Sequence, residues 1–283
     1  MQSAVSFGPE RGSPIVVSAG RAGRGWSRGY VPLLVGVAVL LLLAWTPAAA
    51  SSPRASRLVT PGWAGYLVRS GAAGFAEVRG RWVQPRVVCN RPGSSASIWV
   101  GLGGANSNST ALEQIGTSAD CSERALVSHS AWYQLFPAPA VELPLTIRPG
   151  DAISARVALR GTTVTVVLRN VTTGGAFSSD LEMRSPEADS AEWVVEAPSM
   201  CFRTCEQLPL ADFDRVAFAR ISAAVGTPTG TIRDAAWVSE RLVMATRDRR
   251  TTTAVPTLLS RDGSSFDVER ILVTSASYRR EPR

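Results

Sequence analysis

The sequence contains no lysine and a single histidine, and the shortage of histidine restricts its chemistry. All 30 basic residues are arginine, a bias that we attribute to a GC-rich coding genome rather than to a binding surface. With His129 as the one imidazole, a zinc site built from several histidines is excluded. A Ser-His-Asp or Cys-His arrangement would have to use His129, and no nucleophile elbow lies near it. We therefore expect His129 to be a surface or half-buried polar residue, and we expect no metal and no other cofactor.

The sequence also lacks a concentrated basic surface and a helical pattern. The arginines are scattered, with clusters only at Arg247–Arg250 and at Arg279 and Arg280. Nucleic-acid binding favours a basic stripe with interleaved aromatic residues, so we expect no nucleic-acid partner. No amphipathic repeat is long enough to predict a helix, and no internal repeat is evident.

Residues 1–50 have the organisation of a secretory signal peptide. Arg21, Arg24 and Arg28 precede a single apolar run, and Ala48–Ala50 supply the small residues that a signal peptidase favours. Cleavage would remove four arginines and one glutamate, lowering the formal net charge from +7 to +4. The sequence thus predicts a secreted chain with no stable membrane association. The alternative is an uncleaved anchor, which would make the chain a structural protein of the cell surface.

Four cysteines in an exported chain predict two disulfides. Three pairings are available. The short spacing in CFRTC favours Cys201 with Cys205, which leaves Cys89 with Cys121. Free buried thiols are the alternative and are less common outside the cytoplasm.

After a polar leader at 51–62, short strands separated by Gly, Pro, Asn and Ser predict one all-β domain at 63–274, followed by a polar tail at 275–283. Apolar alternation across 152–159 and 163–170, with a Gly-Thr turn between, predicts a hairpin with one buried face. Many strands with regular turns favour an antiparallel β-sandwich of two sheets. The expected strands are 64–69, 76–83, 96–102, 111–116, 126–136, 141–147, 152–159, 163–170, 190–196, 215–222, 235–244, 254–259 and 266–274.

The strand at 190–198 (SAEWVVEAP) carries two carboxylates. Because side chains alternate along a strand, Glu192 and Glu196 point to one face, while Trp193 and Val195 point to the other. Four residues separate the two acids by ~13 Å, so one site can use only one of them.

Other segments place polar and aromatic residues at the same spacing. In AWYQLFP, Trp132, Gln134 and Phe136 share a face that suits a groove for a polypeptide. An outer sheet face without a functional role would show the same pattern of residues. SIWVGLGG ends in glycines that permit close approach of a backbone or substrate, and ALEQIG carries Glu113 and Gln114 on opposite faces.

Six motifs in order resemble the glutamic peptidases, the eqolisin family, best known from secreted fungal acid proteases. The resemblance covers about Trp63 to Val273. The motifs are WAGY, SIWVGLGG, ALEQIG, AWYQLFP, AEWVVEAP and LPLADF.

The resemblance implies a concanavalin-like sandwich with a substrate cleft on its concave face and a Gln–Glu catalytic pair. The Gln corresponds to Gln114, with Gln84 of WVQP a decoy, and the Glu corresponds to Glu196 rather than Glu192. The implied substrate-binding residues are Trp63, Trp99, Trp132, Gln134 and Phe136.

Supporting acids of the fungal enzymes are replaced here by Gly103, Gln134 and Ser199, and the mature chain is basic where theirs are acidic. The resemblance implies a monomeric secreted endopeptidase that acts on polypeptides, with Glu196 as general base for water and Gln114 stabilising the tetrahedral intermediate. We expect activity in the acidic range. The alternative is a catalytically inactive secreted sandwich that binds peptide or glycan on its aromatic groove.

Overall fold

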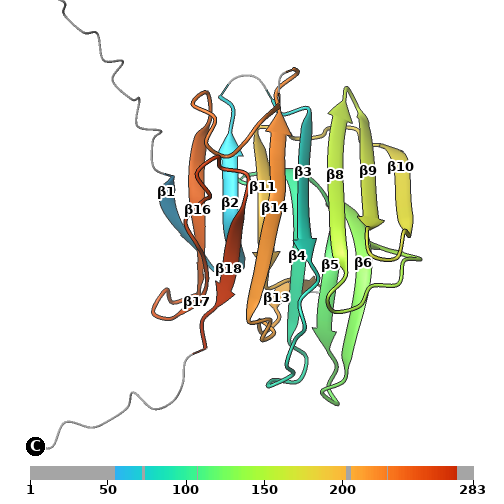
Figure 1. The fold of residues 1–283 in the computed structure, drawn as a ribbon, viewed down its shortest axis with the longest axis vertical. Helices are drawn as coiled ribbons and strands as arrows, with labels where there is room; N and C mark the ends of the chain where they lie inside the picture. The colour runs from blue at the N-terminus through green and yellow to red at the C-terminus, as the bar shows by residue number, and fades with distance from the viewer. Residues whose placement is uncertain (1–54, 72–73, 107, 202–204, 228, 273–283) are drawn as a thin grey trace, which may run out of the picture. The chain divides into compact units, whose positions relative to one another are not determined.

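The computed structural model describes residues 55–71, 74–106, 108–201, 205–227 and 229–272, which form strands and turns without a helix (Figure 1). No segment among these residues is a helix long and apolar enough to cross a membrane. The predicted signal peptide and the predicted tail at 275–283 lie outside the described residues.

The strands of the described part of the chain are short and follow one another closely. They are β1 (Ser56–Thr60), β2 (Trp63–Arg69), β3 (Glu77–Val83), β4 (Ser95–Gly103), β5 (Leu112–Cys121), β6 (Val127–Phe136), β7 (Val141–Leu143), β8 (Ala152–Arg160), β9 (Thr163–Asn170), β10 (Ala176–Glu182), β11 (Ser190–Glu196), β12 (Ser199–Cys201), β13 (Cys205–Gln207), β14 (Arg215–Ala224), β15 (Thr229–Gly230), β16 (Val238–Ala245), β17 (Thr252–Pro256) and β18 (Phe266–Arg270).

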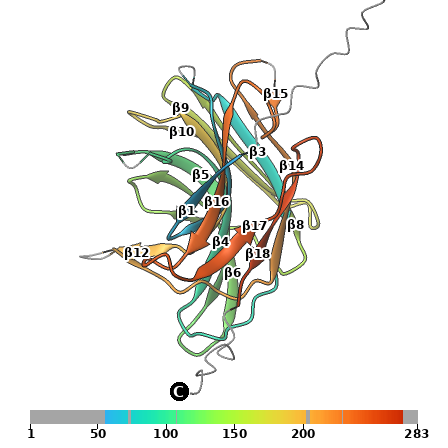
Figure 2. The same cartoon turned by 90° about the vertical axis from the view of Figure 1, so that its left-hand side faces the viewer.

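The strands form a β-sandwich, as predicted, and its two halves are joined at one edge. One half has the order β10-β9-β8-β3-β14-β18, and the other has the order β16-β2-β11-β4-β5-β6-β7. β17 pairs with both β18 and β16 and so links the halves. Figure 1 shows β14, β3 and β8 in front of β11, β4 and β5, and Figure 2 turns the β16–β17–β18 edge toward the viewer.

The core lies between the halves and follows from the alternation of apolar residues. In β8 and β9, Ile153, Val157, Val164 and Val166 are fully buried, and they belong to the same cluster as Ile115 of the other half. Burial of side chains of this size contributes about 1.5–3 kcal/mol each. The predicted hairpin at 152–159 and 163–170 is confirmed, with β8 extending one residue further.

Several segments differ from the sequence prediction. β12, β13 and β15 were not predicted, β5 extends beyond the predicted 111–116 to Cys121, and the strands predicted to end at 259 and 274 end at Pro256 and Arg270. Residues 56–60 of the predicted leader form β1, which pairs in parallel with β16. Its first three side chains are exposed, so its sequence lacks the apolar alternation that would predict a strand. β10 was not predicted, because it is an edge strand with largely polar side chains. The strand predicted at 141–147 ends at Leu143, because Pro144 lacks the N–H that would continue the ladder.

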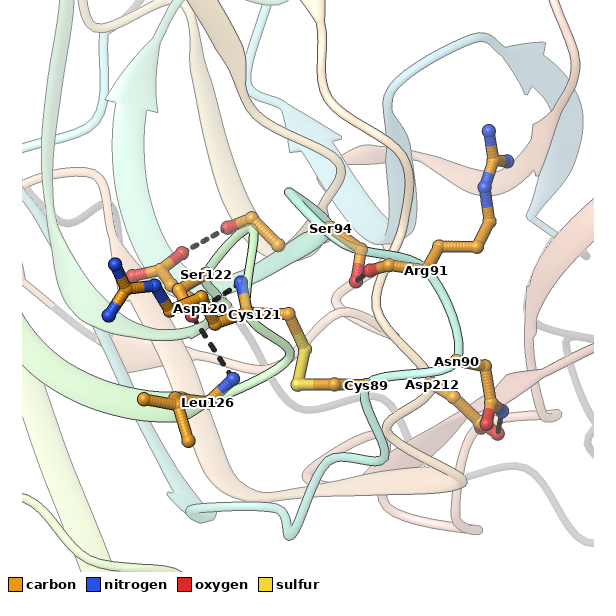
Figure 3. Close-up of a disulfide and its surroundings, with 11 residues drawn as sticks. Cys89, Asn90, Arg91, Ser94, Asp120, Cys121, Ser122, Leu126 and Asp212 are labelled. Carbon is orange, nitrogen blue, oxygen red and sulfur yellow. Dashed lines mark hydrogen bonds between the residues drawn. A yellow bond between two sulfur atoms is a disulfide. The ribbon is translucent and has the colours of Figure 1, made fainter.

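A disulfide joins Cys89, in the loop before β4, to Cys121 at the end of β5 (Figure 3). Around it, Asn90 donates a hydrogen bond of 3.0 Å to Asp212, and the Cys121 N–H donates one of 2.8 Å to the carbonyl of Ser94. The predicted Cys201–Cys205 bridge depends on the side chain of Cys201, which lies outside the described residues. The backbone register does set Cys201 opposite Cys205 in the β12–β13 pair.

Candidate active site

Glu196 ends β11, beside β2 and β4, on the sheet face that points away from the main core. Its register partners are Trp63 on β2 and Ser97 on β4. Residues paired directly across strands share a face, so all three side chains lie on the face predicted for the cleft. Trp193 and Val195, the alternate residues of β11, belong to the main core.

Two indoles surround the Glu196 carboxyl group. Trp99 Nε1 donates a hydrogen bond of 2.8 Å to Glu196 Oε2. Trp63 packs edge-on against Trp99, with ring centroids 5.0 Å apart. Desolvation raises the pKa of Glu196 above its usual value, and hydrogen bonding from Trp99 and Trp63 partly offsets the rise. Glu196 is therefore a carboxylate that holds its proton to a higher pH than a solvated one.

The Trp99 side chain is fixed by the glycine beside it. Gly116 is its register partner on β5, and a Cβ added there would lie 2.6 Å from Trp99 Cβ. The absence of a side chain at Gly116 thus leaves room for the indole. Trp99 and the partly buried Trp63 and Trp132 form a small apolar cluster on this face, separate from the main core.

A chain of hydroxyl groups extends from Glu196 toward Trp132. Ser97 Oγ and Ser118 Oγ are 2.8 Å apart, and Trp132 Nε1 donates a hydrogen bond of 2.8 Å to Ser118 Oγ. Both serines are buried. Neither serine was predicted as a site residue. Strand alternation could have indicated them, because Ser97 lies two residues before Trp99 and Ser118 four residues after Gln114, each on the same face of its strand.

Gln114 lies on the same face, one cross-strand row beyond Trp99. It is buried, and its Nε2 donates a hydrogen bond of 2.8 Å to Gln134 Oε1. Gln134 in turn donates to the carbonyl of Ala138 at 2.9 Å, which fixes the orientation of both amides. Gln114 Oε1 has no hydrogen-bond partner among the described residues.

Gln114 and Glu196 share a face but do not contact each other through a hydrogen bond in the described part of the chain. The register pairs Gln114 with Gly101, and Gly101 with Glu192, four residues from Glu196. The offset between the Gln114 and Glu196 Cα atoms is therefore ~13 Å along the strands and ~10 Å across them. The gap between them is bordered by Trp99.

Glu192 is in the opposite environment to Glu196. It is fully buried, and neither carboxylate oxygen has a hydrogen-bond partner among the described residues. Burial raises the pKa of Glu192 well above its ordinary value. Its protonated form is therefore favoured to a higher pH than that of a solvated glutamate.

The remaining predicted residues fall at the edges of this arrangement or outside it. Phe136, at the end of β6, is 44% exposed. Gly103 has a φ of +78°, and a Cβ there would lie 2.8 Å from Glu187 Cβ, so the backbone excludes an acid at this position. Gln84 is buried and bonded to Thr117 and His129. His129 is half-buried, as predicted, and does not reach the site.

A pocket of about 480 Å³ opens beside Glu196. It contains two arginines that the sequence analysis noted only as part of a cluster, Arg247 and Arg249. Its lining residues are Thr60, Pro61, Gly62, Trp63, Glu196, Ala197, Ser199, Gln207, Thr246, Arg247 and Arg249.

The described residues contain no group of three or more His, Cys, Asp or Glu side chains placed to hold a metal ion. The chemical groups that the site does offer are a desolvated carboxyl, an oriented amide and buried hydroxyls beside an aromatic surface.

Comparison with known proteins matches this arrangement to one family. The sequence profile of the peptidase A4 family matches residues 61–260. Comparison with curated protein sequences finds no match.

Solved structures of glutamic peptidases share the fold. Scytalido-glutamic peptidase with a peptide-based transition state analogue has a TM-score of 0.63 at 20% identity, covering 75% of this chain and 98% of that one. SCP-B, an eqolisin in complex with the tripeptide Ala-Ile-His, has a TM-score of 0.61 at 20% identity, with the same coverage. Aspergilloglutamic peptidase from Aspergillus niger has a TM-score of 0.52 at 26% identity, covering 62% of this chain and 99% of that one.

Fold and profile together define a β-sandwich peptidase. The chain belongs to the peptidase A4 family, the eqolisins or glutamic peptidases.

Proposed function

We propose that the protein is a secreted, monomeric endopeptidase that hydrolyses peptide bonds in polypeptides, with Glu196 as general base and Gln114 as stabiliser of the tetrahedral intermediate. The observation that carries this proposal is the Glu196 carboxyl group, which is desolvated, bonded to Trp99 and open to a pocket. A positioned carboxylate of raised pKa beside an aromatic surface suits general acid–base work on a bound peptide.

The proposed reaction uses one water and returns every proton. Glu196 takes a proton from the water while the hydroxide oxygen adds to the scissile carbonyl carbon. An N–H of Gln114 donates a hydrogen bond to the resulting oxyanion, an interaction typically worth about 3 kcal/mol in the transition state. The protonated Glu196 then gives its proton to the leaving nitrogen as the C–N bond breaks.

The spacing of the two side chains is compatible with this order of events. Their offset is too large for a direct hydrogen bond, as the register shows. The space between the two side chains is large enough for a water and a carbonyl group, each held by a hydrogen bond of ~2.8 Å. The second N–H of the Gln114 amide remains for the substrate, since the first is taken by Gln134.

The proposed pH range follows from Glu196. Because a general base must be ionised, kcat/KM should rise with pH through the raised pKa of Glu196. A single carboxyl that must also return the proton favours an acidic rather than an alkaline optimum.

The test is proteolysis of denatured casein or haemoglobin between pH 2.5 and 7, in the presence of pepstatin-type and serine-directed inhibitors. We expect cleavage by the unmodified chain and a loss of at least a hundredfold in kcat/KM for Glu196→Gln and for Gln114→Ala. Glu269→Gln, an exposed residue of β18, serves as the control and should retain full activity. Full activity of a folded Glu196→Gln protein would contradict the assignment of Glu196 as the general base.

A further inference from the structure

The pocket beside Glu196 carries positive charge on the wall formed by the β16–β17 loop. Arg247 and Arg249 line it and are exposed. Across from them stand the β1–β2 turn and Gln207 of β13, which donates a hydrogen bond of 2.7 Å to the carbonyl of Pro61. The pocket is thus built from three segments that are far apart in the sequence.

The loop that carries these arginines is held by its own hydrogen bonds. The Thr246 N–H donates to the Thr251 carbonyl at 2.8 Å, and the Arg249 N–H donates to the Thr246 carbonyl at 2.7 Å. Asp248 accepts hydrogen bonds from the Thr246 hydroxyl and from the Arg250 N–H. The loop therefore has a defined shape rather than one imposed by contact with the pocket.

Some charged side chains of this loop form an ion pair with each other, and others do not. Asp248 forms an ion pair with Arg250 at 3.9 Å, and neither residue lines the pocket. The guanidinium groups of Arg247 and Arg249 have no ion pair or hydrogen bond within the described part of the chain. Two neighbouring cations without a protein partner form a ready site for an anion.

Glu196 does not neutralise these arginines. The groups that shift its pKa are its own desolvation and the two indoles, and no arginine is among them. Since Glu196 must also remain free to handle the proton of a water, a carboxylate of the substrate is the anion that suits these arginines.

We propose that this pocket is a substrate subsite that selects an acidic side chain, Asp or Glu, within three residues of the scissile bond. The proposal rests on the proposed function, because it takes Glu196 as the point at which the peptide is cut. Arginine binds carboxylates through parallel N–H groups, and the volume of about 480 Å³ accommodates a Glu side chain together with backbone.

The test uses octapeptides that are acetylated at the N-terminus and amidated at the C-terminus, so that no terminal charge competes. Glu, Gln or Arg is placed in turn at each of three positions on either side of the cleaved bond. At pH 5.5 we expect one position at which kcat/KM for Glu exceeds that for Gln about tenfold. The ratio should fall toward one at pH 3.5, because the substrate Glu is then mostly protonated, and it should shrink in 1 M salt.

Matched variants locate the effect in the pocket. Arg247→Glu/Arg249→Glu should abolish the preference for Glu over Gln and create a preference for Arg, and Arg247→Gln/Arg249→Gln should abolish the preference alone. Arg250→Glu changes a charge in the same loop outside the pocket and should keep the Glu preference. Equal cleavage of Glu and Gln peptides at every position would overturn the proposal while leaving the peptidase intact.

A binding measurement separates this proposal from the catalytic one. With the Glu196→Gln protein, fluorescence anisotropy of labelled Glu and Gln octapeptides at pH 5.5 should give about a tenfold difference in Kd. If the unmodified chain cuts none of the peptides but this difference is present and is lost in Arg247→Glu/Arg249→Glu, the subsite stands and the catalytic proposal fails. Equal Kd values would count against the subsite whatever the activity.

Discussion

Two glutamates on one face of one strand lie in opposite environments. Glu196 is bonded to an indole and open to a pocket, whereas Glu192 is fully buried without a hydrogen-bond partner in the described part of the chain. Strand alternation predicted their shared face, and the spacing of motifs selected Glu196. Their burial depends on which residues cover each end of β11, and those residues come from elsewhere in the chain. A local sequence pattern therefore predicts the sheet face to which a side chain points, but not whether that side chain is buried or exposed to solvent.

At the residue scale, Trp99→Phe should raise the pKa of Glu196. The indole N–H donates to the carboxylate and so favours its charged form. Its loss removes about 1.5–3 kcal/mol of stabilisation of the ionised carboxylate, as is typical of a hydrogen bond to a charged group. The acidic limb of the pH profile of kcat/KM should therefore move to higher pH.

Trp132→Phe is the control for this shift. Its indole donates to the hydroxyl of Ser118 and not to a carboxylate. The acidic limb should stay in place in this variant even where KM changes. An unmoved limb in Trp99→Phe would show that the hydrogen bond does not tune Glu196.

At the element scale, buried strands were predictable, and the edge strands β1 and β10 were not. β9 and β11 have the predicted bounds, because β9 alternates buried apolar residues with less buried ones and β11 is buried along almost its whole length. β1 and β10 expose most of their side chains, and pairing with β16 or β9 is what makes them strands. Such pairing is a long-range event that leaves little trace in the local sequence.

β1 matters to the site because its last residue holds the first residue of β2. The Thr60 hydroxyl donates to the Trp63 carbonyl at 2.6 Å and accepts from the Trp63 N–H at 2.9 Å. Thr60→Val keeps the shape but removes both bonds, at about 1 kcal/mol each. We expect Tm to fall by roughly 4–8 °C and KM to rise severalfold, because Trp63 borders Glu196.

Thr60→Ser retains the hydroxyl group and is the matched variant. Thermal unfolding and steady-state kinetics on the two proteins, measured together, should show Thr60→Ser close to the unmodified chain. Equal losses in both variants would mean that the methyl group, rather than the hydrogen bonds, secures the corner between β1 and β2.

At the scale of the whole domain, the site combines predicted and unpredicted parts. Its aromatic residues and its Gln and Glu were predicted on a common face, and the register places them there. The pocket was not predicted, because it assembles the β1–β2 turn, the end of β11, Gln207 of β13 and the β16–β17 loop through β1–β16 and β2–β11 pairing. Nothing local to Arg247 or Arg249 indicates that Glu196 lies nearby.

Two buried carboxyl groups make the stability of the domain depend on pH. Burial raises the pKa of Glu113 to about 8, and Glu192 is shifted in the same direction. Glu113 faces the opposite side of the sheet from Glu192, since its register partners are Leu102 and Leu135. Desolvation is the main cause of the raised pKa of Glu192, and the charge of Glu113 adds to it, so the two acids are coupled contributions to the stability of one sandwich.

The consequence is a stability that decreases as pH rises. A carboxyl whose folded pKa exceeds its unfolded value stabilises the fold fully below the unfolded pKa near 4.5, and this stabilisation is lost as pH rises through the folded pKa. For Glu113, fully buried, the change between pH 4.5 and 8 is on the order of 5 kcal/mol. Thermal unfolding followed by circular dichroism from pH 4 to 9 should show Tm falling by roughly 10 °C or more.

Glu113→Gln tests the cause, because its amide resembles the protonated acid and its oxygen can still accept the hydrogen bond from the Glu187 N–H. The difference in Tm between Glu113→Gln and the unmodified chain should be small at pH 4.5 and should widen in favour of the variant up to pH 8. Glu269→Gln, exposed on β18, should track the unmodified chain at every pH. A constant difference for Glu113→Gln would mean that this carboxyl is ionised in the folded protein. If the difference widens as expected, catalysis by Glu196 gains from rising pH while the fold loses from it, and the two opposing slopes together confine activity to the acidic range.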